Sequence, residues 1–187
     1  FTITKAPLTL TVSLEGWTFG NQPEEIYPEI DGNEGEGGET FYFKVKNADD
    51  NTYSEEVPKN AGEYTIKIVV AETDNYASGS ATTDFTIAKA NITPTVALTG
   101  WTYGATANTP VVTGKPDDAE VSYTYSVNTE NPEEQEFTTT VPENAGSYIV
   151  KATVSETTNY NSGEATSSFT IAKADMSMVS VAYNDLD

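Results

Sequence analysis

The feature that most constrains this sequence is an internal repeat with a period of 84 residues. Residues 1–6 read FTITKA, and residues 85–90 and 169–174 both read FTIAKA. Self-similarity at a fixed period is the signature of a repeat architecture. A period of this length is too long for a solenoid unit and fits a small β-sandwich with its own core.

Landmarks between these segments recur in the same order. They are GWTFG at 16–20 and GWTYG at 100–104, VPKNAGEY at 57–64 and VPENAGSY at 141–148, and ETDNY at 72–76 and ETTNY at 156–160. One segment drifts, because PEIDG at 28–32 aligns best with PVVTG at 110–114. Small compensating insertions in loops explain this drift, since loops tolerate them.

Apolar residues alternate with polar ones along several short segments, which is typical of half-buried strands. The first copy carries Leu8, Leu10, Val12 and Leu14, then Phe41, Phe43 and Val45, then Tyr64, Ile66, Ile68 and Val70, then Phe85 and Ile87. The second copy carries Tyr123, Tyr125 and Val127, then Tyr148, Val150, Ala152 and Val154. Turn residues separate these segments. The pattern predicts an all-β chain of two tandem immunoglobulin-like β-sandwiches.

The repeat predicts the domain boundaries. Residues 1–6 end a preceding repeat, 7–89 form repeat 1, 90–173 form repeat 2, and 174–187 begin a truncated third repeat. The link at 88–91 is short and has neither Gly nor a Ser run, so we expect an elongated arrangement with little bending. For 176–183 we expect order only through contact with another molecule, because an isolated strand is unstable in water.

Composition excludes several classes of function. The formal net charge is −20, from 29 acidic against 9 basic residues, so neither nucleic acid nor an anionic membrane is an expected partner. The chain has no Cys and no His, which removes thiolate and imidazole chemistry. No carboxylate pair stands out, and a small sandwich offers little cleft. We therefore expect no enzyme activity and no cofactor.

The four recurring motifs, taken in the same order twice, resemble the MBG-type repeats of bacterial cell-surface, adhesin-like proteins. The resemblance covers nearly the whole chain. It implies immunoglobulin-like domains displayed in many copies outside the cell, with neighbouring repeats of the same chain as partners. It brings no shared catalytic residues. On this basis we expect an extended stalk or spacer at the bacterial surface.

Two alternatives to the stalk stay open. The chain is a module that binds a glycan or a host or extracellular-matrix protein, or it is an accessory domain of a larger carbohydrate-active enzyme. The candidate contacts are the loop aromatics Trp17, Tyr27 and Trp101. An exposed Trp can stack on a sugar ring, whereas a buried one closes the end of a sandwich. Because both repeats carry the Trp, we expect the second role.

The Asn-Ala-Gly-x-Tyr segment is interpreted as a structural turn. Its residues are Asn60, Gly62 and Tyr64 in repeat 1 and Asn144, Gly146 and Tyr148 in repeat 2. A Gly lets the chain turn tightly, and the Tyr can hydrogen-bond back to the backbone. The arrangement resembles the tyrosine corner of immunoglobulin folds.

Acidic clusters and repeated lysines are further candidate sites. The clusters at 31–36, 49–50, 117–118 and 133–134 differ between repeats and match no calcium-loop pattern, so we expect no metal. Lys5, Lys89 and Lys173 follow the closing strands. A Lys–Asn crosslink to Asn60, Asn75, Asn144 or Asn159 is one hypothesis. An exposed Lys is the expectation, because burying a Lys is costly.

Overall fold

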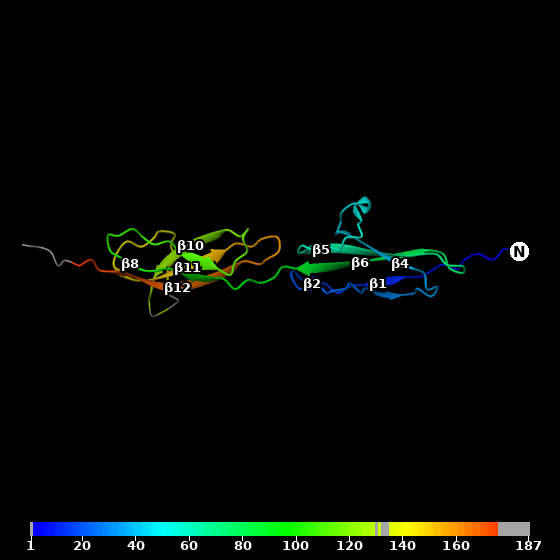
Figure 1. The fold of residues 1–187 in the computed structure, drawn as a ribbon, viewed down its shortest axis with the longest axis horizontal. Helices are drawn as coiled ribbons and strands as arrows, with labels where there is room; N and C mark the ends of the chain where they lie inside the picture. Colours follow the sequence, from blue (N-terminus) through cyan, green and yellow to red (C-terminus); the bar gives the residue numbers. More distant parts are fainter. Residues whose placement is uncertain (1, 130, 132–134, 176–187) are drawn as a thin grey trace, which may run out of the picture. The chain divides into compact units, whose positions relative to one another are not determined.

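A computed structural model of the protein describes residues 2–129, 131 and 135–175. It divides into two compact units, and each is all β apart from one short 3-10 helix in the first (Figure 1). Unit 1 comprises Phe1–Asn91 and the loop Glu156–Asn161, and unit 2 comprises Ile92–Ser155 and Ser162–Asp187. The predicted all-β fold of two tandem sandwich-like domains is confirmed. The prediction that 176–183 are ordered only through contact with another molecule concerns residues outside the described ones.

Unit 1 pairs a four-stranded sheet with a two-stranded one. The larger sheet has the order β2 (Trp17–Thr18), β6 (Gly79–Ala88), β5 (Gly62–Val70) and β4 (Glu39–Val45), and the smaller sheet pairs β1 (Thr11–Ser13) with β3 (Glu29–Asp31). Strands β4, β5 and β6 are antiparallel neighbours, whereas β2 joins β6 in parallel.

Unit 2 repeats this arrangement. Its larger sheet has the order β10 (Val121–Val127), β11 (Gly146–Val154), β12 (Gly163–Ala172) and β8 (Trp101–Thr102), and its smaller sheet pairs β7 (Thr95–Ala97) with β9 (Val111–Thr113). The registers match those of unit 1: Tyr64 lies opposite Phe85, and Tyr148 lies opposite Phe169. The two copies of the repeat therefore fold in the same way.

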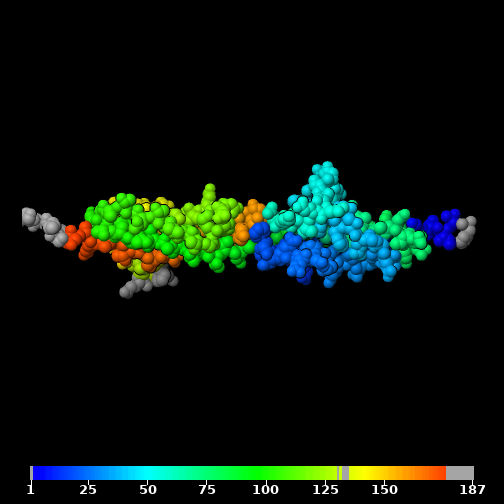
Figure 2. Space-filling model, viewed as in Figure 1, coloured from blue at the N-terminus to red at the C-terminus, as the bar shows by residue number. Residues whose placement is uncertain are grey.

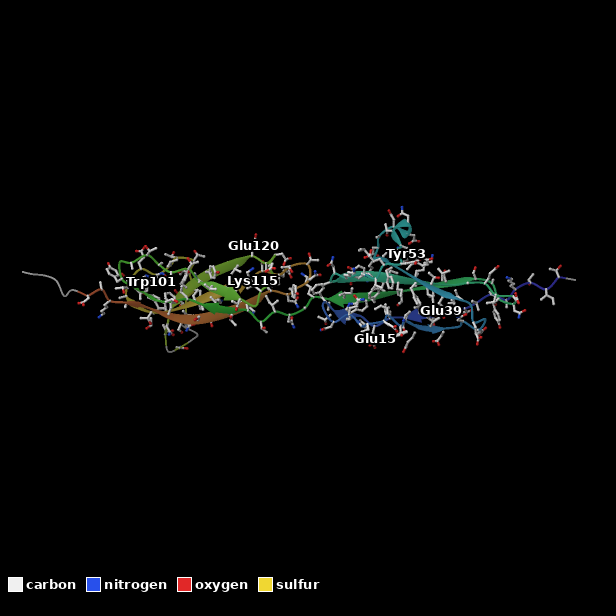
Figure 3. The ribbon with its side chains drawn as sticks, viewed as in Figure 1. Glu15, Glu39, Tyr53, Trp101, Lys115 and Glu120 are labelled. Carbon is white, nitrogen blue, oxygen red and sulfur yellow. The ribbon has the colours of Figure 1, made fainter. Side chains whose placement is uncertain are left out.

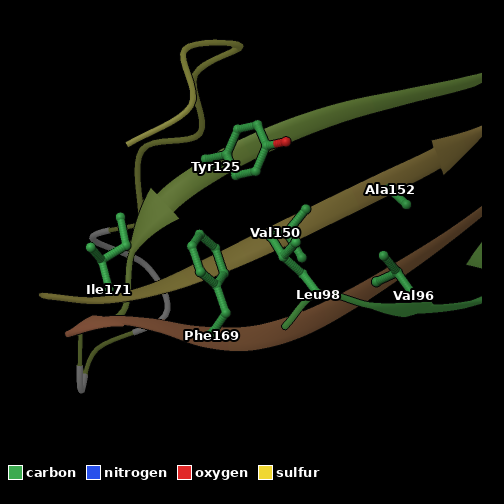
Figure 4. Packing of buried hydrophobic residues seen from close by; sticks show 7 residues of the cluster. All are labelled: Val96, Leu98, Tyr125, Val150, Ala152, Phe169 and Ile171. Carbon is green, nitrogen blue, oxygen red and sulfur yellow. The ribbon is translucent and has the colours of Figure 1, made fainter. Parts of the chain in front are cut away.

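The predicted inward faces of the long strands form the cores. Ile66, Ile68 and Val70 of β5 are fully buried, and Phe85 of β6 is 5% exposed. In unit 2 the corresponding side chains of β11 and β12 enclose Leu98 and Val96, which come from the β7 segment (Figure 4). The core thus fills the space between the two sheets. Burial of branched and aromatic side chains is the main driving force for this packing.

The Gly-Trp segments, whose tryptophans were predicted to lie in loops, form short strands. Trp17 pairs with Ile87 in parallel, and Trp101 pairs with Ile171. The physical reason is Gly16, because a Cβ there would lie 2.0 Å from the carbonyl oxygen of Thr86. Glycine alone allows the two backbones to come this close. The chain can therefore cross from the smaller sheet to the edge of the larger one.

The strand predicted from Leu8 to Leu14 is shorter than the alternation suggests. Only Thr11–Ser13 forms the paired strand β1. Gly32, with a φ of +87°, approaches the Thr9 carbonyl so closely that a Cβ would lie 2.0 Å from it, and the ladder ends there. Leu10 and Leu14 remain half-buried beside the strand, so the predicted face holds although its pairing is shorter.

A segment between β4 and β5 projects from the body of unit 1. It contains the 3-10 helix η1 (Asp50–Thr52), coloured cyan in Figure 2. After η1 the chain returns to β4, where Phe43 and Ser54 exchange backbone hydrogen bonds of 2.7 and 2.9 Å. This bridge covers part of the free edge of β4. Covering an edge in this way removes donors and acceptors that another chain could pair with.

Candidate functional site

The Asn-Ala-Gly-x-Tyr turns are built identically in both units. The hydroxyl of Tyr64 donates to the carbonyl of Asn60 at 3.0 Å, and Tyr148 donates to Asn144 at 3.0 Å. A Cβ on Gly62 would lie 3.3 Å from the ring of Tyr64, so the glycine leaves the ring room to lie over the turn. The geometry gives this motif a structural task at the start of β5 and of β11.

Both tryptophans pack onto the core rather than standing free. Trp17 stacks on Phe85 with ring centroids 5.3 Å apart, and Tyr64 stacks on the same ring at 5.7 Å. In unit 2 the same two distances place Phe169 between Trp101 and Tyr148. Offset aromatic stacking stabilises such clusters beyond the area that they bury.

The predicted contact aromatics do not come together in unit 1. Tyr27 is 75% exposed and lines a shallow hollow with Pro23, Ile26 and Leu14, whereas Trp17 is half-buried against Phe85. The structure therefore gives unit 1 no joint platform of Trp17 and Tyr27.

Unit 2 has an open hollow beside its tryptophan. It has a volume of about 390 Å³ and lies between the Gly-Trp segment and the Val-Pro segment, near the labelled Trp101 in Figure 3. Tyr103 is 52% exposed at its wall, and Val141 is 38% exposed. Pro142 and Glu143 also line the hollow. An aromatic, an aliphatic and a carboxylate side chain thus face one concave surface.

The projecting segment of unit 1 is held by a cationic cluster. Lys44 donates to Asp50 at 2.6 Å and to the Ala48 carbonyl at 2.8 Å, and its ammonium lies 4.8 Å from the ring centre of Tyr53. Tyr53 is labelled in Figure 3. Lys67 lies 5.6 Å from the same ring. The hydrogen bond to Asp50 raises the pKa of Lys44 and lowers that of Asp50, while burial raises the pKa of Tyr53.

A second polar network on unit 1 centres on Asp84. The Thr65 hydroxyl donates to this carboxylate at 2.7 Å, and the Lys46 ammonium lies 3.4 Å away. The hydrogen bond from Thr65, with the help of Lys46, holds the pKa of Asp84 below its ordinary value. The equivalent position in unit 2 is Ser168, which lies opposite Ile149. The network is therefore particular to the first repeat.

Two of the three repeated lysines, Lys5 and Lys89, make ion pairs at the surface. Lys5 lies 3.2 Å from Glu72, and Lys89 lies 3.1 Å from Glu156. The Nζ atoms thus face glutamates rather than the asparagines that the crosslink hypothesis requires. Among the described residues, no group of three acidic side chains is close enough to hold a metal ion. In the same part of the chain, no helix has the length and apolarity needed to span a bilayer.

Both units match the model of a known domain family. The model of the MBG domain matches residues 45–91 and 93–175, which include both Asn-Ala-Gly-x-Tyr turns and the Gly-Trp segment of unit 2. The chain belongs to the MBG domain family. A search of curated proteins gave no match. The resemblance inferred from the four motifs is confirmed by the family model.

Sequence reasoning missed two features of the MBG repeats. It did not single out Tyr103 or Val141, although both stand within motifs that recur, because a motif does not reveal which of its members are exposed. It also treated the Asn-Tyr pairs of the 72–76 and 156–160 segments only as landmarks of the repeat. The sequence contained a signal for a further role, because an Asn and a Tyr recur side by side in both segments. A turn alone does not require this pair.

Proposed function

We propose that this pair of MBG repeats is a non-catalytic spacer, a stalk module of a protein on the outside of a bacterial cell. The observation that supports this most is how the recurring residues are used. Trp17, Phe85 and Tyr64 stack on one another, and their counterparts in unit 2 do the same. The residues that recur in both repeats therefore form the same aromatic core cluster in each unit, which we call the framework of the repeat.

The features that differ between the repeats also fit a spacer. The projecting segment with Asp50 and the network around Asp84 lie at the surface of unit 1, and unit 2 has Ser168 in place of Asp84. A net charge of −20 adds solubility and repulsion between neighbouring molecules. A spacer tolerates such variation, because its task depends on the framework and not on one surface group.

The spacer role is tested by display on a bacterial surface. The chain is placed between a membrane anchor and an antibody epitope, and binding of antibody-coated beads is measured by flow cytometry. We expect more bead binding than with the epitope fused directly to the anchor. A matched chain carrying Gly16→Ala and Gly100→Ala, which disrupts both frameworks, should lose this gain. Equal bead binding with and without the intact chain would remove the support for a spacer.

A second candidate function is binding of a glycan or protein through the hollow of unit 2. The exposed ring of Tyr103 beside Trp101 and Glu143 favours it, because aromatic rings stack on sugars and carboxylates accept hydrogen bonds from hydroxyls. Glycan and matrix-protein arrays probed with the intact chain test this. Signals that disappear in Tyr103→Ala but persist in Tyr42→Ala would favour a binding module over a pure spacer.

A further inference from the structure

Repeat 1 has two extra residues where its chain runs from the Gly-Trp segment to the smaller sheet. The segment 20–28 reads GNQPEEIYP, whereas its counterpart 104–110 reads GATANTP. In unit 2 the Asn108 side chain donates to the carbonyls of Thr99 and Gly100 at 3.0 and 3.2 Å, and so ties the shorter segment to the approach of β8. In repeat 1 the longer segment carries an Ile, a Tyr and two Glu instead. The insertion therefore gives unit 1 a surface that unit 2 does not have.

The longer segment is anchored on the core of unit 1. Ile26 packs against the buried cluster that contains Phe85, and Leu14, which follows β1, packs against the same cluster. Tyr27 comes directly after Ile26 and is 75% exposed. The ring of Tyr27 is therefore held at the surface beside a residue that is anchored in the core.

A hollow of about 550 Å³ lies beside this ring, and we call it the Tyr27 hollow. Its apolar lining is formed by Leu14, Pro23 and Ile26. Its carboxylates are those of Glu15, Glu25 and Glu29, and all three side chains are exposed. An aromatic ring, an apolar wall and three negative charges thus border one concave surface in the middle of unit 1.

The three carboxylates of the Tyr27 hollow are not neutralised by the chain itself. Among the described residues none of them makes an ion pair, and Glu29 accepts only a 3.4 Å hydrogen bond from the Ser13 hydroxyl. The lysines of unit 1 are engaged elsewhere, because five pair with other carboxylates and Lys67 lies over the ring of Tyr53. In Figure 3, Glu15 lies on the opposite side of unit 1 from Tyr53. Like charges gathered at a concave surface attract a cation from outside.

The layout of the Tyr27 hollow fits an organic cation rather than a metal ion. In the described part of the chain no three acidic side chains are close enough to hold a metal, so these carboxylates border the hollow instead of converging on one point. An arginine side chain matches this layout, because a guanidinium stacks on aromatic faces and forms paired hydrogen bonds with carboxylates. Its methylene stem covers apolar surface. A neutral sugar also stacks on an aromatic ring, but it leaves the three charges uncompensated.

We propose that the Tyr27 hollow is a binding site for an arginine side chain in a basic segment of a partner protein. The guanidinium lies over the ring of Tyr27, its stem contacts Leu14 and Ile26, and the three glutamates accept its hydrogen bonds. The net charge of −20 attracts such a partner from a distance, and the hollow makes the contact specific. The site rests neither on the spacer role nor on the hollow of unit 2.

A labelled peptide of alternating Arg and Gly residues is the probe, and its fluorescence anisotropy is titrated with the intact chain at physiological salt, which screens diffuse attraction. We expect saturable binding that Tyr27→Ala weakens about fivefold, which corresponds to about 1 kcal/mol. Tyr27→Phe should bind like the wild type, because it keeps the ring. Tyr103→Ala, which removes an exposed tyrosine of unit 2, is the matched control and should not weaken binding. None of these substitutions changes the charge of the chain.

Two charge-matched variants separate the site from the general acidity of the chain. Glu15→Gln with Glu25→Gln removes two charges from the hollow, and Glu34→Gln with Asp117→Asn removes two exposed charges elsewhere. We expect the first pair to weaken binding about tenfold more than the second, a difference of about 1.4 kcal/mol. Equal losses in the two pairs, unchanged binding in Tyr27→Ala, or no saturable binding to the wild type would overturn the proposal. None of these results would affect the display assay for the spacer role.

Discussion

The hydroxyl of Tyr64 donates to the backbone carbonyl of Asn60 at 3.0 Å and so closes the turn that begins β5. Tyr148 and Asn144 have the same relationship at the start of β11. The ring of each Tyr also stacks on a core Phe, at 5.7 Å in both units. One side chain therefore fixes both the turn and the end of the core.

Removing the hydroxyl alone separates these two contributions. We expect Tyr64→Phe to lower the unfolding free energy of unit 1 by about 1 kcal/mol, the usual net value of one hydrogen bond. The measurement is urea unfolding in a Trp101→Phe background, where Trp17 reports unit 1. Tyr42→Phe, whose hydroxyl has no hydrogen bond among the described residues, should be nearly neutral. Equal effects of the two substitutions would contradict a role for the turn.

Phe85 is the centre of the unit 1 cluster, 5% exposed and stacked between Trp17 and Tyr64. Phe85→Ala should destabilise unit 1 by about 3–5 kcal/mol, because it leaves a cavity that its neighbours fill only in part. Val45→Ala, at a 59% exposed position of β4, is the matched control and should have little effect. Thermal unfolding monitored by circular dichroism and by Trp17 fluorescence distinguishes the two outcomes.

The parallel pairing of β2 with β6 depends on the missing side chain at Gly16. A Cβ there would lie 2.0 Å from the Thr86 carbonyl oxygen, so Gly16→Ala should force β2 away from the sheet and expose Trp17. A red shift of Trp17 emission, together with faster hydrogen exchange at the Phe19 amide, is the expected result. Gly38→Ala serves as the control, since a Cβ there meets nothing within 4 Å. A well-folded Gly16→Ala variant with native emission would show that the close approach is not required.

The alternation of apolar and polar residues along β5 and β6 was enough to predict which faces are buried. The two strands are paired, and their apolar residues lie on the same side of the sheet. The alternation was not enough for Trp17, which reads as part of a turn between two glycines. Its strand is two residues long, and its partner lies about 70 residues away, so no local pattern could reveal the pairing. The exposure of Tyr103 was equally hidden, because a recurring motif does not reveal which of its members are exposed.

Acid should weaken unit 1 through Asp84 and Asp50. The pKa of each carboxylate is lowered in the folded state, by Thr65 and Lys44 respectively, so each contributes stability above its unfolded pKa. This contribution is lost as the pH falls from about 5 through the folded pKa. Urea unfolding of the Trp101→Phe chain between pH 7 and pH 2 should show the decline.

Asp84→Asn should flatten that pH dependence, because the substituted side chain has no proton to gain. Asp74→Asn, at an exposed carboxylate outside the network, is the control and should keep the wild-type slope. An unchanged slope in Asp84→Asn would show that the acid sensitivity of unit 1 arises elsewhere.

Calcium should not stabilise the chain. Melting temperatures measured with calcium and with a chelator are expected to coincide in both the Trp17 and the Trp101 signals. A site occupied at 100 times its dissociation constant would add about 2.7 kcal/mol, which a melting curve detects readily. A large shift with calcium would show that acidic loops such as 31–36 hold the ion together.

The parallel strand β2 gives each repeat a mechanical consequence. A pull between the two ends of unit 1 draws β2 toward the start of the chain and β6 toward its end, so the two strands are loaded in shear along their shared ladder. The bonds of the ladder that pairs β2 with β6, and the 2.8 Å bond from Phe19 to Ala88, then bear force together instead of opening one after another. Resistance of this kind is set by the rate of forced unfolding rather than by equilibrium stability. Gly16 is therefore a small residue on which the tensile strength of the repeat depends.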